Sequence, residues 1–433
     1  MNRTLQQRLV NYVDDKQDRL ITLISELVRR PSENKPPIGS EGECQRYIAS
    51  MIRAAALTPD VYGLDSVPGL TEHPLFWGDR IYTDRANVGA RRPGLGGGRS
   101  LLLSSHIDTV PSGTLPWTRD PFGAEIEGNR LYGRGSNDMK AGAAMNLFIL
   151  EAAQDLDLPL RGDLLFESVV DEEFGGVNGT LAGRLRGYNA DAAILTEPSS
   201  LRICAAQRGG RTVHITFSSQ GGVIANQDAP ARVMDQVAHF IKELDHFAEQ
   251  RRDNCRPHSL YAHTPDPVPV AITKITTGPW GTGEPITLPE ICRIEMYWQL
   301  MPGEEQVVVE HEFHDWMASM MEKKSQLFRR RPIVEFPIRW LPGSAISASE
   351  PLITELAQCA AMVLPEIPVV TGIEGPCDMF VFHQFEIPTA VWGPSGGNTH
   401  GADEYVELDS VVLATKALLL FLCRWCGTDA LEA

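Results

Sequence analysis

Residues that could bind a metal ion follow an apolar stretch that begins at residue 101. The run 101–111 reads LLLSSHIDTVP, so His106 and Asp108 come directly after three leucines and two serines. Such runs are typical of buried parallel strands, and open α/β sheets bind ligands beyond the carboxyl ends of their strands. A neutral imidazole is a ligand for transition metals, and Asp108 is placed to fix the orientation of His106. An H-x-D sequence alone leaves a structural role for both residues open.

Further carboxylates and a second histidine follow glycine-rich turns or apolar strands elsewhere in the chain. They are Asp138 in GRGSNDMKAG, Glu172 and Glu173 in VVDEEFGG, Glu197 in LTEP, and His400 in THGADE. An acidic run such as the one that contains Glu172 and Glu173 is most often a solvated turn. The glycine-rich stretch GRGSNDMKAG could instead surround a phosphate, but it lacks the lysine and Ser/Thr ending of a P-loop. Imidazole and carboxylate ligands suit zinc, manganese or cobalt, and a free glutamate beside two such ions could act as a base.

The composition restricts the class of protein. The 433 residues include 39 basic and 56 acidic ones, which give a formal net charge of −17. This charge argues against nucleic acid or an anionic membrane surface as a partner. The N-terminal residues lack the apolar core of a secretory signal, and there is no run of about 18 apolar residues that could span a membrane. With its eight scattered cysteines, the sequence therefore predicts a cytoplasmic protein of two or three domains.

Alternating strands and helices must position the candidate residues. Strands predicted at 101–106, 163–170 and 191–196 alternate with helices at 140–155 and near 176–187. This alternation favours a mostly parallel α/β sheet with helices on both faces. The remaining elements of this domain are predicted at 5–30, 41–57, 349–363, 377–385 and 409–426 for helices, and at 368–371 and 387–392 for strands.

A second pattern interrupts this alternation. It begins at 211–218, where apolar and polar residues alternate as in a half-exposed antiparallel strand. The elements that follow are a helix near 229–252, strands at 268–276 and 291–300, a helix from 304 to about 328 and a strand at 333–340. This βαββαβ order is that of a ferredoxin-like α+β domain. We therefore predict a catalytic domain of residues 1–206 and 342–433, interrupted by an inserted domain of residues 207–341. The role of the Pro- and Gly-rich segment 58–98 is open.

The chain resembles the dinuclear metallohydrolase family of acetylornithine deacetylase, succinyl-diaminopimelate desuccinylase and carboxypeptidase G. The resemblance rests on the motifs SSHIDTVP, GRGSNDMKAG, VVDEEFGG, LTEP and THGADEYV, which occur in the order of the family. It implies an α/β catalytic domain with an inserted ferredoxin-like lid through which two subunits form a homodimer. It also implies two divalent metal ions per subunit (Zn, Mn or Co) and a small carboxylate-bearing substrate.

The resemblance further implies a role for each candidate residue. The implied metal ligands are His106, Asp138, Glu173, Glu197 and His400. Asp138 would bridge the two ions, and Asp108 would orient His106. Glu172 would be the general base that takes a proton from the metal-activated water. The implied reaction is hydrolysis of a C–N bond, as in an N-acyl amino acid deacylase or a peptidase.

The inserted domain departs from the family at three positions. Asn226 in GGVIANQDAP replaces a histidine, Ile286 lies near an expected asparagine, and Gln299 replaces an arginine. Either this domain has drifted while keeping a structural role, or the substrate is unusual. In the second case, the Asn226 amide would stabilise negative charge on the substrate. Arg208 or Arg211 would then bind a substrate carboxylate.

Alternatives to amide hydrolysis remain. The same metal centre could displace ammonia from an electron-poor aromatic amine, as in a nitroanthranilate aminohydrolase, because attack on an aryl carbon places no charge on a carbonyl oxygen. The chain could also be a catalytically inactive metal-binding protein, but the complete ligand set and Glu172 argue against this. Asp378 follows a Gly-Pro turn and is a further candidate for orienting His400 or its loop.

Overall fold

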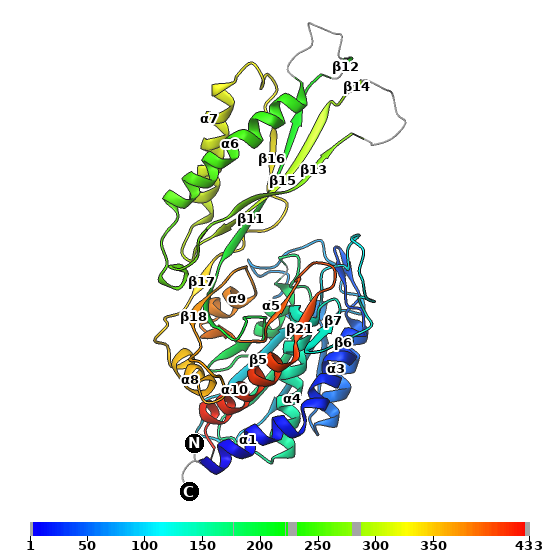
Figure 1. Cartoon of the computed structure of the whole chain (residues 1–433), viewed down its shortest axis with the longest axis vertical. Coiled ribbons are helices and arrows are strands. Elements are labelled where there is room, and N and C mark those ends of the chain that lie inside the picture. The colour runs from blue at the N-terminus through cyan, green and yellow to red at the C-terminus, as the bar shows by residue number, and fades with distance from the viewer. Residues whose placement is uncertain (1–2, 176, 221, 224–231, 279–286, 429–433) are drawn as a thin grey trace. The chain divides into compact units, whose positions relative to one another are not determined.

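The chain folds into two compact units, which Figure 1 shows in a computed structural model. The structure describes residues 3–175, 177–220, 222–223, 232–278 and 287–428. The first unit comprises residues 1–206, 345–373 and 377–433, and the second comprises residues 207–344 and 374–376. Among the described residues there is no helix with both the length and the apolar character needed to cross a membrane.

A nine-stranded mixed sheet forms the centre of the first unit. Its strand order is β17-β10-β19-β9-β5-β8-β4-β3, and β18 pairs with β10. The bounds are β3 Asp60–Gly63, β4 Ala86–Arg92, β5 Leu101–His106, β8 Leu164–Val169, β9 Ala193–Leu195, β10 Ile203–Gln207, β17 Ser344–Ala345, β18 Val370–Ile373 and β19 Thr389–Val391. The strands from β19 to β8 run parallel, whereas β10, β4 and β3 join antiparallel. The predicted parallel arrangement therefore applies to the centre of the sheet, where the candidate residues lie.

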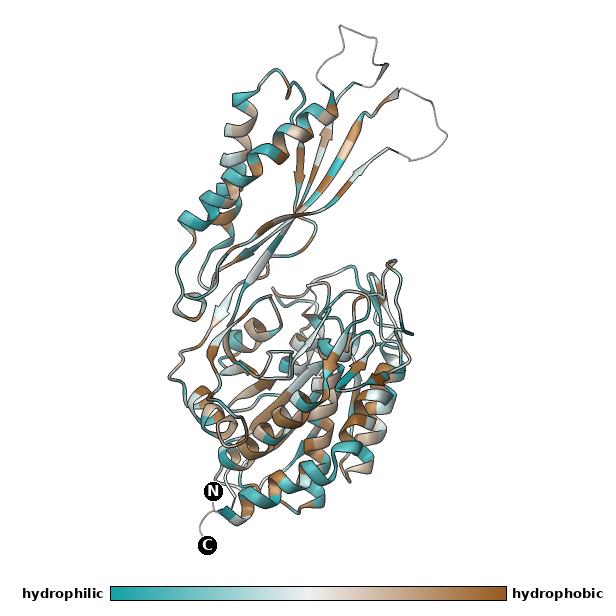
Figure 2. Cartoon of the chain, viewed as in Figure 1, coloured by the Kyte–Doolittle hydropathy of each residue, from teal (hydrophilic) through white to brown (hydrophobic). Residues whose placement is uncertain are grey.

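Helices surround these central strands. They are α1 Arg3–Asp15, α2 Gln17–Val28, α3 Gly42–Ala54, α4 Ala141–Asp155, α5 Asn178–Arg186, α8 Pro351–Ala360, α9 Met379–Gln384 and α10 Leu408–Cys426. Figure 2 shows brown, apolar residues along the central strands, while teal residues predominate on α1. The single helix predicted over 5–30 is two helices, because the backbone leaves helical geometry at Lys16.

Short elements complete the first unit and were not predicted from the sequence. They are β1 Asn34–Lys35, β2 Ile38–Gly39, β6 Glu125–Glu127, β7 Arg130–Tyr132, β20 Gly396–Gly397, β21 Tyr405–Glu407 and the helical turns η1 Leu64–Ser66 and η2 Ser136–Lys140. The strands β20, β21, β7 and β6 form one antiparallel sheet in that order. This sheet brings the segment before Asp138 beside the segment after His400.

The second unit contains a four-stranded antiparallel sheet of order β13-β15-β11-β16. Its elements are β11 Gly209–Ser218, α6 Val233–Asn254, β13 Val270–Thr277, β15 Ile291–Leu300, α7 Gln306–Lys323 and β16 Ile333–Glu335, with β12 Gly222–Val223, β14 Thr287–Leu288 and the turn η3 Ser259–Tyr261 beside them. This is the βαββαβ arrangement of a ferredoxin-like domain. Apolar side chains of β11 and β15 pack against α6 and α7, and Phe247, Trp298 and Phe313 are fully buried among them.

Gly142, at the start of α4, packs against the backbone that leads to Glu197. A Cβ atom on Gly142 would lie 2.0 Å from the carbonyl oxygen of Thr196. Because both segments are buried, the Gly142→Ala substitution is expected to lower the free energy of unfolding by about 1–3 kcal/mol. Chemical denaturation measures this change. Gly63→Ala is the control, since its Cβ would meet open space and its φ is −71°. Equal stability of the two variants would contradict the prediction.

Candidate metal centre

His106 ends strand β5 and is only 3% exposed. Its Nε2 atom lies 3.1 Å from Oδ1 of Asp138 and 3.5 Å from Oε1 of Glu197. Its Nδ1 atom lies 2.9 Å from the main-chain carbonyl oxygen of Asp108. Because a carbonyl oxygen only accepts hydrogen bonds, Nδ1 of neutral His106 carries the proton and Nε2 keeps its lone pair. His106 thus directs a metal-binding atom toward the two carboxylates.

Asp138 lies in η2, between the two histidines. Its Oδ1 atom is 3.1 Å from Nε2 of His106, and its Oδ2 atom is 3.2 Å from Nε2 of His400. Nε2 of His400 is also 3.0 Å from Oε2 of Glu173, in the loop after β8. Each oxygen of the Asp138 carboxylate therefore faces a different imidazole, and Nε2 of each imidazole has a further carboxylate oxygen within 3.5 Å.

The five predicted ligands thus come together from five separate segments of the first unit. Ligand atoms of His106, Asp138 and Glu173 lie within 4.8 Å of one another. The set consists of imidazole nitrogens and carboxylate oxygens, which zinc, manganese and cobalt all accept. A carboxylate with one oxygen toward each histidine has the form needed to bind two ions at once. The donor set therefore fits a pair of divalent metal ions.

Negative charge is concentrated in this site, where the carboxylates of Asp138 and Glu173 are largely buried and the His400 side chain is 51% exposed. Burial, together with the charge of the neighbouring Asp138, raises the pKa of Glu173 to about 6. Burial also raises the pKa of Glu172 well above its ordinary value. Burial lowers the pKa of His400, but hydrogen bonds to Asp138 and Glu173 outweigh it and raise that pKa to about 11. The carboxylates outnumber the imidazoles, so divalent cations would relieve the repulsion among them.

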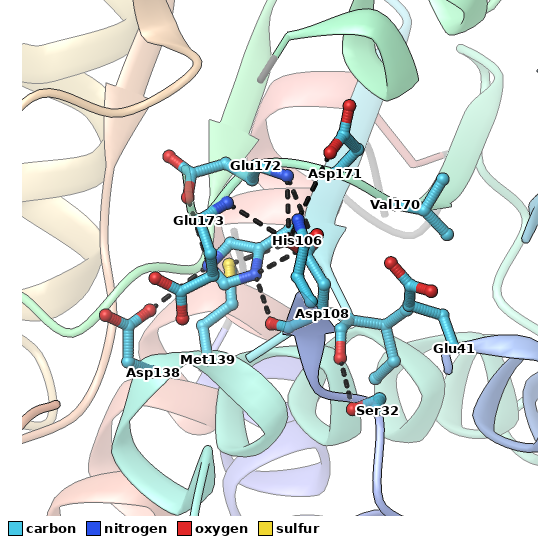
Figure 3. Close-up of polar contacts among 12 residues, drawn as sticks. Ser32, Glu41, His106, Asp108, Asp138, Met139, Val170, Asp171, Glu172 and Glu173 are labelled. Carbon is cyan, nitrogen blue, oxygen red and sulfur yellow. Dashed lines mark hydrogen bonds and ion pairs between the residues drawn. The ribbon is translucent and has the colours of Figure 1, made fainter. Parts of the chain in front are cut away.

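The contacts of Asp108 differ from those expected. Its carboxylate is 3.7 Å from Nδ1 of His106, which contacts the Asp108 carbonyl oxygen instead. The carboxylate accepts hydrogen bonds from the main-chain N–H groups of Glu172 at 2.9 Å and Glu173 at 3.0 Å (Figure 3). It also accepts one from the side-chain amide of Asn34 at 2.9 Å. Asp108 therefore orients His106 through its main chain, and its side chain holds the loop that carries Glu172 and Glu173.

Glu172 lies beside the ligand group without joining it. Its side chain is 15% exposed, and Oε2 is 3.9 Å from Nε2 of His106, which is beyond hydrogen-bond distance. It lines a small cavity together with Glu197, Thr180 and Asp378. Glu172 is thus close to the predicted metal ligands while its carboxylate remains available for proton transfer.

Among the described residues, Asp378 forms no hydrogen bond with His400. Its carboxylate accepts a hydrogen bond from the hydroxyl of Thr180, and burial raises its pKa to about 7. The small cavity that it lines also contains Glu172 and Glu197. Asp378 therefore belongs to the surroundings of Glu172.

Glu404 is a candidate residue that the sequence reasoning missed. Its side chain is fully buried and pairs with Arg134. Its carboxylate accepts the main-chain N–H groups of Gly135, Asn137 and Asp138, each at 3.0 Å. Glu404 thus fastens the segment that carries Asp138 to the segment that carries His400. The motif THGADE contains this glutamate, but only its histidine was assigned a role.

We expect Glu404→Gln to weaken divalent metal binding by about 10- to 100-fold, since residues around metal ligands typically contribute this much. The amide NH₂ group of the glutamine would face main-chain N–H groups, and two donors cannot form a hydrogen bond with each other. Titration calorimetry with Mn²⁺ and Zn²⁺ on chelator-treated protein measures the affinity. Asp403→Asn is the control, because the Asp403 carboxylate accepts hydrogen bonds from the main chain and hydroxyl of the exposed Thr118. Equal affinities of the two variants would contradict this role.

The predicted substrate-binding arginines both have partners within the second unit. Arg211 is 4% exposed, pairs with Glu310 at 2.5 Å and donates to the carbonyl oxygen of Ile338 at 2.6 Å. Arg208 donates to the side-chain oxygen of Gln299. The charge of Arg211 is therefore balanced by a carboxylate, whereas the hydrogen-bond partner of Arg208 is neutral. Asn226 and Ile286 lie outside the described residues.

Sequence comparisons identify relatives over nearly the whole chain. N-formyl-4-amino-5-aminomethyl-2-methylpyrimidine deformylase of Bacillus subtilis is 25% identical over 440 residues, which cover 96% of each chain. Succinyl-diaminopimelate desuccinylase of Leptothrix cholodnii is 27% identical over 408 residues, 90% of this chain and 94% of the relative. These comparisons do not support the alternative in which ammonia is displaced from an aromatic amine.

Solved structures share the fold. Human carnosine dipeptidase 1 matches with a TM-score of 0.74 and 14% identity, covering 98% of this chain and 99% of its own. A dinuclear metal-binding peptidase of the M20 family from Bacillus subtilis matches with a TM-score of 0.58 and 15% identity, covering 95% and 99%. Residues 102–424 match the model of peptidase family M20/M25/M40. The chain therefore belongs to this family and is a metal-dependent hydrolase of carbon–nitrogen bonds.

Proposed function

We propose that this enzyme uses two divalent metal ions and the general base Glu172 to hydrolyse an amide bond in a small, carboxylate-bearing molecule. The observation that carries the proposal is the position of Asp138, with one carboxylate oxygen facing His106 and the other facing His400. In this assignment, His106 and Glu197 would hold one ion, and Glu173 and His400 would hold the other. Asp138 would contribute one oxygen to each.

The mechanism follows from the chemistry of these groups. When bound, divalent ions lower the pKa of a water molecule and polarise a carbonyl oxygen. Glu172 takes a proton from the attacking water and later delivers it to the leaving nitrogen. Its raised pKa suits a carboxyl group that must both accept and donate a proton near neutral pH. Asp108 holds the main chain of Glu172 in place by accepting a hydrogen bond from its N–H group.

The substrate is proposed to be an N-acyl amine with a small acyl group. The names of the two relatives describe removal of formyl and succinyl groups from nitrogen, which supports this class. Of the two predicted arginines, Arg208 is the better candidate for binding a substrate carboxylate, because Arg211 is already paired with Glu310. Asn226 would stabilise negative charge on the carbonyl oxygen.

The second unit is proposed to serve as a lid and as the dimerisation domain of a cytoplasmic homodimer. Its ferredoxin-like topology supports this role, because the resemblance in sequence predicts such a domain. Size-exclusion chromatography with light scattering would test it. A dimer in the full chain, lost when the exposed apolar residues Val307 and Val308 of α7 are changed to serine, is the expected result. A monomeric full chain would contradict it.

The experiment that tests the reaction is a hydrolysis assay with Zn-, Mn- or Co-loaded protein. The substrates are N-formyl, N-acetyl and N-succinyl amines, with and without a carboxylate, together with dipeptides. The expected result is a new primary amine and a new carboxylate in equal amounts from at least one carboxylate-bearing amide. The proposed substrate class would be overturned if amides without the carboxylate were hydrolysed equally fast. It would also be overturned if none of the substrates were hydrolysed.

A further inference from the structure

Asp171, the residue immediately before Glu172, has an unusual backbone conformation. Its φ is 67°, in the left-handed region that residues other than glycine seldom occupy, and its side chain is fully buried. Such a conformation persists only where surrounding contacts stabilise it. The contacts that hold Asp171 therefore determine where the chain directs Glu172.

The Asp171 carboxylate accepts hydrogen bonds from four side chains. The hydroxyl of Tyr82 donates to Oδ2 at 2.7 Å. Nε of Arg80, Nη2 of Arg85 and Nδ2 of Asn34 are 3.3, 3.4 and 3.2 Å from Oδ1. Three of the four donors come from residues 80–85, within the segment 58–98 whose role the sequence left open.

Residues 77–85, which we call the brace, are themselves firmly held. Trp77 exchanges two hydrogen bonds with Asn178, the first residue of α5, at 3.0 and 2.7 Å. The Asn178 amide also donates to the hydroxyl of Tyr82 at 2.7 Å. The Arg80 guanidinium lies 4.0 Å from the centre of a Trp77 ring. Arg85 forms a fully buried ion pair with Glu41. The brace is therefore a fixed support and not a loose loop.

The brace connects to the loop of Glu172 through two carboxylates. The amide of Asn34 donates both to Asp171 and to Asp108, at 3.2 and 2.9 Å. Asp108 in turn accepts the main-chain N–H of Glu172 at 2.9 Å. Figure 3 shows Asp171, Glu172 and Asp108 next to one another, with Asp171 directed away from His106. If Asp171 lost its conformation, the N–H group of Glu172 would leave the Asp108 carboxylate.

We infer that the brace, acting through Asp171, is a positioning device that aims the Glu172 carboxylate at the reacting water. This inference rests on the proposed function, in which Glu172 is the general base. Asp171, Tyr82, Arg80 and Arg85 are thus positioning residues, which act through Glu172 and touch no substrate. None of them is among the predicted metal ligands, and the ligand Glu173 is also held by the main-chain N–H group of Val110 at 3.1 Å. A loss of the brace is therefore expected to lower the rate of reaction while Glu173 keeps its place among the ligands.

The test uses Tyr82→Phe, which removes the hydroxyl that contacts Asp171 and keeps the buried ring. The expected result is a kcat lowered by about 10- to 100-fold, as for a misplaced catalytic group, with KM within about threefold and unchanged Mn²⁺ affinity by calorimetry. Tyr62→Phe is the matched control. Tyr62 is also a buried tyrosine, and its hydroxyl accepts a hydrogen bond from Asn87 at 3.2 Å. This control is expected to keep the kcat of the unmodified enzyme.

A double variant separates a positioning role from a merely structural one. If Tyr82 acts through Glu172, the variant Tyr82→Phe/Glu172→Gln has the same kcat as Glu172→Gln alone, because the two effects are not additive. A kcat for Tyr82→Phe within twofold of the unmodified enzyme, or additive effects, would overturn the inference. If Tyr82→Phe does not fold, Asp171→Asn takes its place, since asparagine tolerates the left-handed conformation. Full activity of Glu172→Gln would instead refute the proposed function itself.

Discussion

The Glu172→Gln variant is expected to lose about 10²- to 10⁴-fold in kcat while binding metal ions as tightly as the unmodified enzyme. The substitution keeps the size of the side chain but removes its ability to take a proton. Glu172 is 3.9 Å from His106, and the ligand positions are occupied by other carboxylates. Steady-state kinetics on the amide substrate and calorimetric metal titration measure the two quantities.

Glu173→Gln is the natural comparison, because the two glutamates are adjacent and differ in their contacts. Oε2 of Glu173 is 3.0 Å from His400, and Oε1 accepts the main-chain N–H group of Val110 at 3.1 Å. We expect this variant to bind metal more weakly, in contrast to Glu172→Gln. If both variants lost metal equally, or if Glu172→Gln kept full activity, the assignment of base and ligand would be wrong.

The Asp138→Asn variant is expected to lose affinity for both metal ions. One oxygen of Asp138 faces His106 and the other faces His400, so the substitution alters both halves of the site. The loss should exceed the roughly 10- to 100-fold decrease that follows from changing a residue around the ligands. Metal content by mass spectrometry after dialysis, and affinity by calorimetry, provide the measurement.

His400→Ala is the matched comparison for this prediction. His400 lies beside Asp138 and Glu173, at one of the two proposed ion positions. Glu197 lies beside His106, at the other position. We expect His400→Ala to retain one ion per subunit under conditions in which Asp138→Asn retains none. Retention of two ions by Asp138→Asn would show that its carboxylate does not bridge them.

The central strands of the first unit could be predicted from the sequence, whereas the edges of its sheet could not. Apolar stretches such as the three leucines at 101–103 mark buried parallel strands, and the structure has a strand over Leu101–His106. The strands β3 and β4 lie in a segment rich in Pro and Gly, where alternation is weak. Strands of two or three residues, such as β20 and β21, are too short to show any period.

The grouping of the candidate residues could be predicted, but their individual contacts could not. Residues at the carboxyl ends of neighbouring parallel strands must meet at one edge, so His106, Glu173 and Glu197 come together. An H-x-D pattern does not reveal that the carbonyl of Asp108, and not its carboxylate, contacts His106. That difference depends on the loop of Glu172, which supplies other donors to the carboxylate.

Contacts between segments that are distant in the chain could not be predicted from the sequence either. Glu404 accepts hydrogen bonds from residues about 270 positions earlier in the chain, with separations of 269, 267 and 266 residues, and no local pattern encodes such partners. Arg211 was predicted to bind substrate because of its charge, but Glu310 lies close enough to pair with it. Such pairings, like the contacts between the brace and Asp171, arise only when the tertiary fold brings distant residues together.

The most direct test of the two-metal site is anomalous scattering from crystals of the zinc-loaded protein. Two anomalous peaks per subunit are expected, one bound by His106 and Glu197 and the other by His400 and Glu173, with Asp138 in contact with both. A single peak, or two peaks that do not share Asp138, would contradict the proposed metal centre.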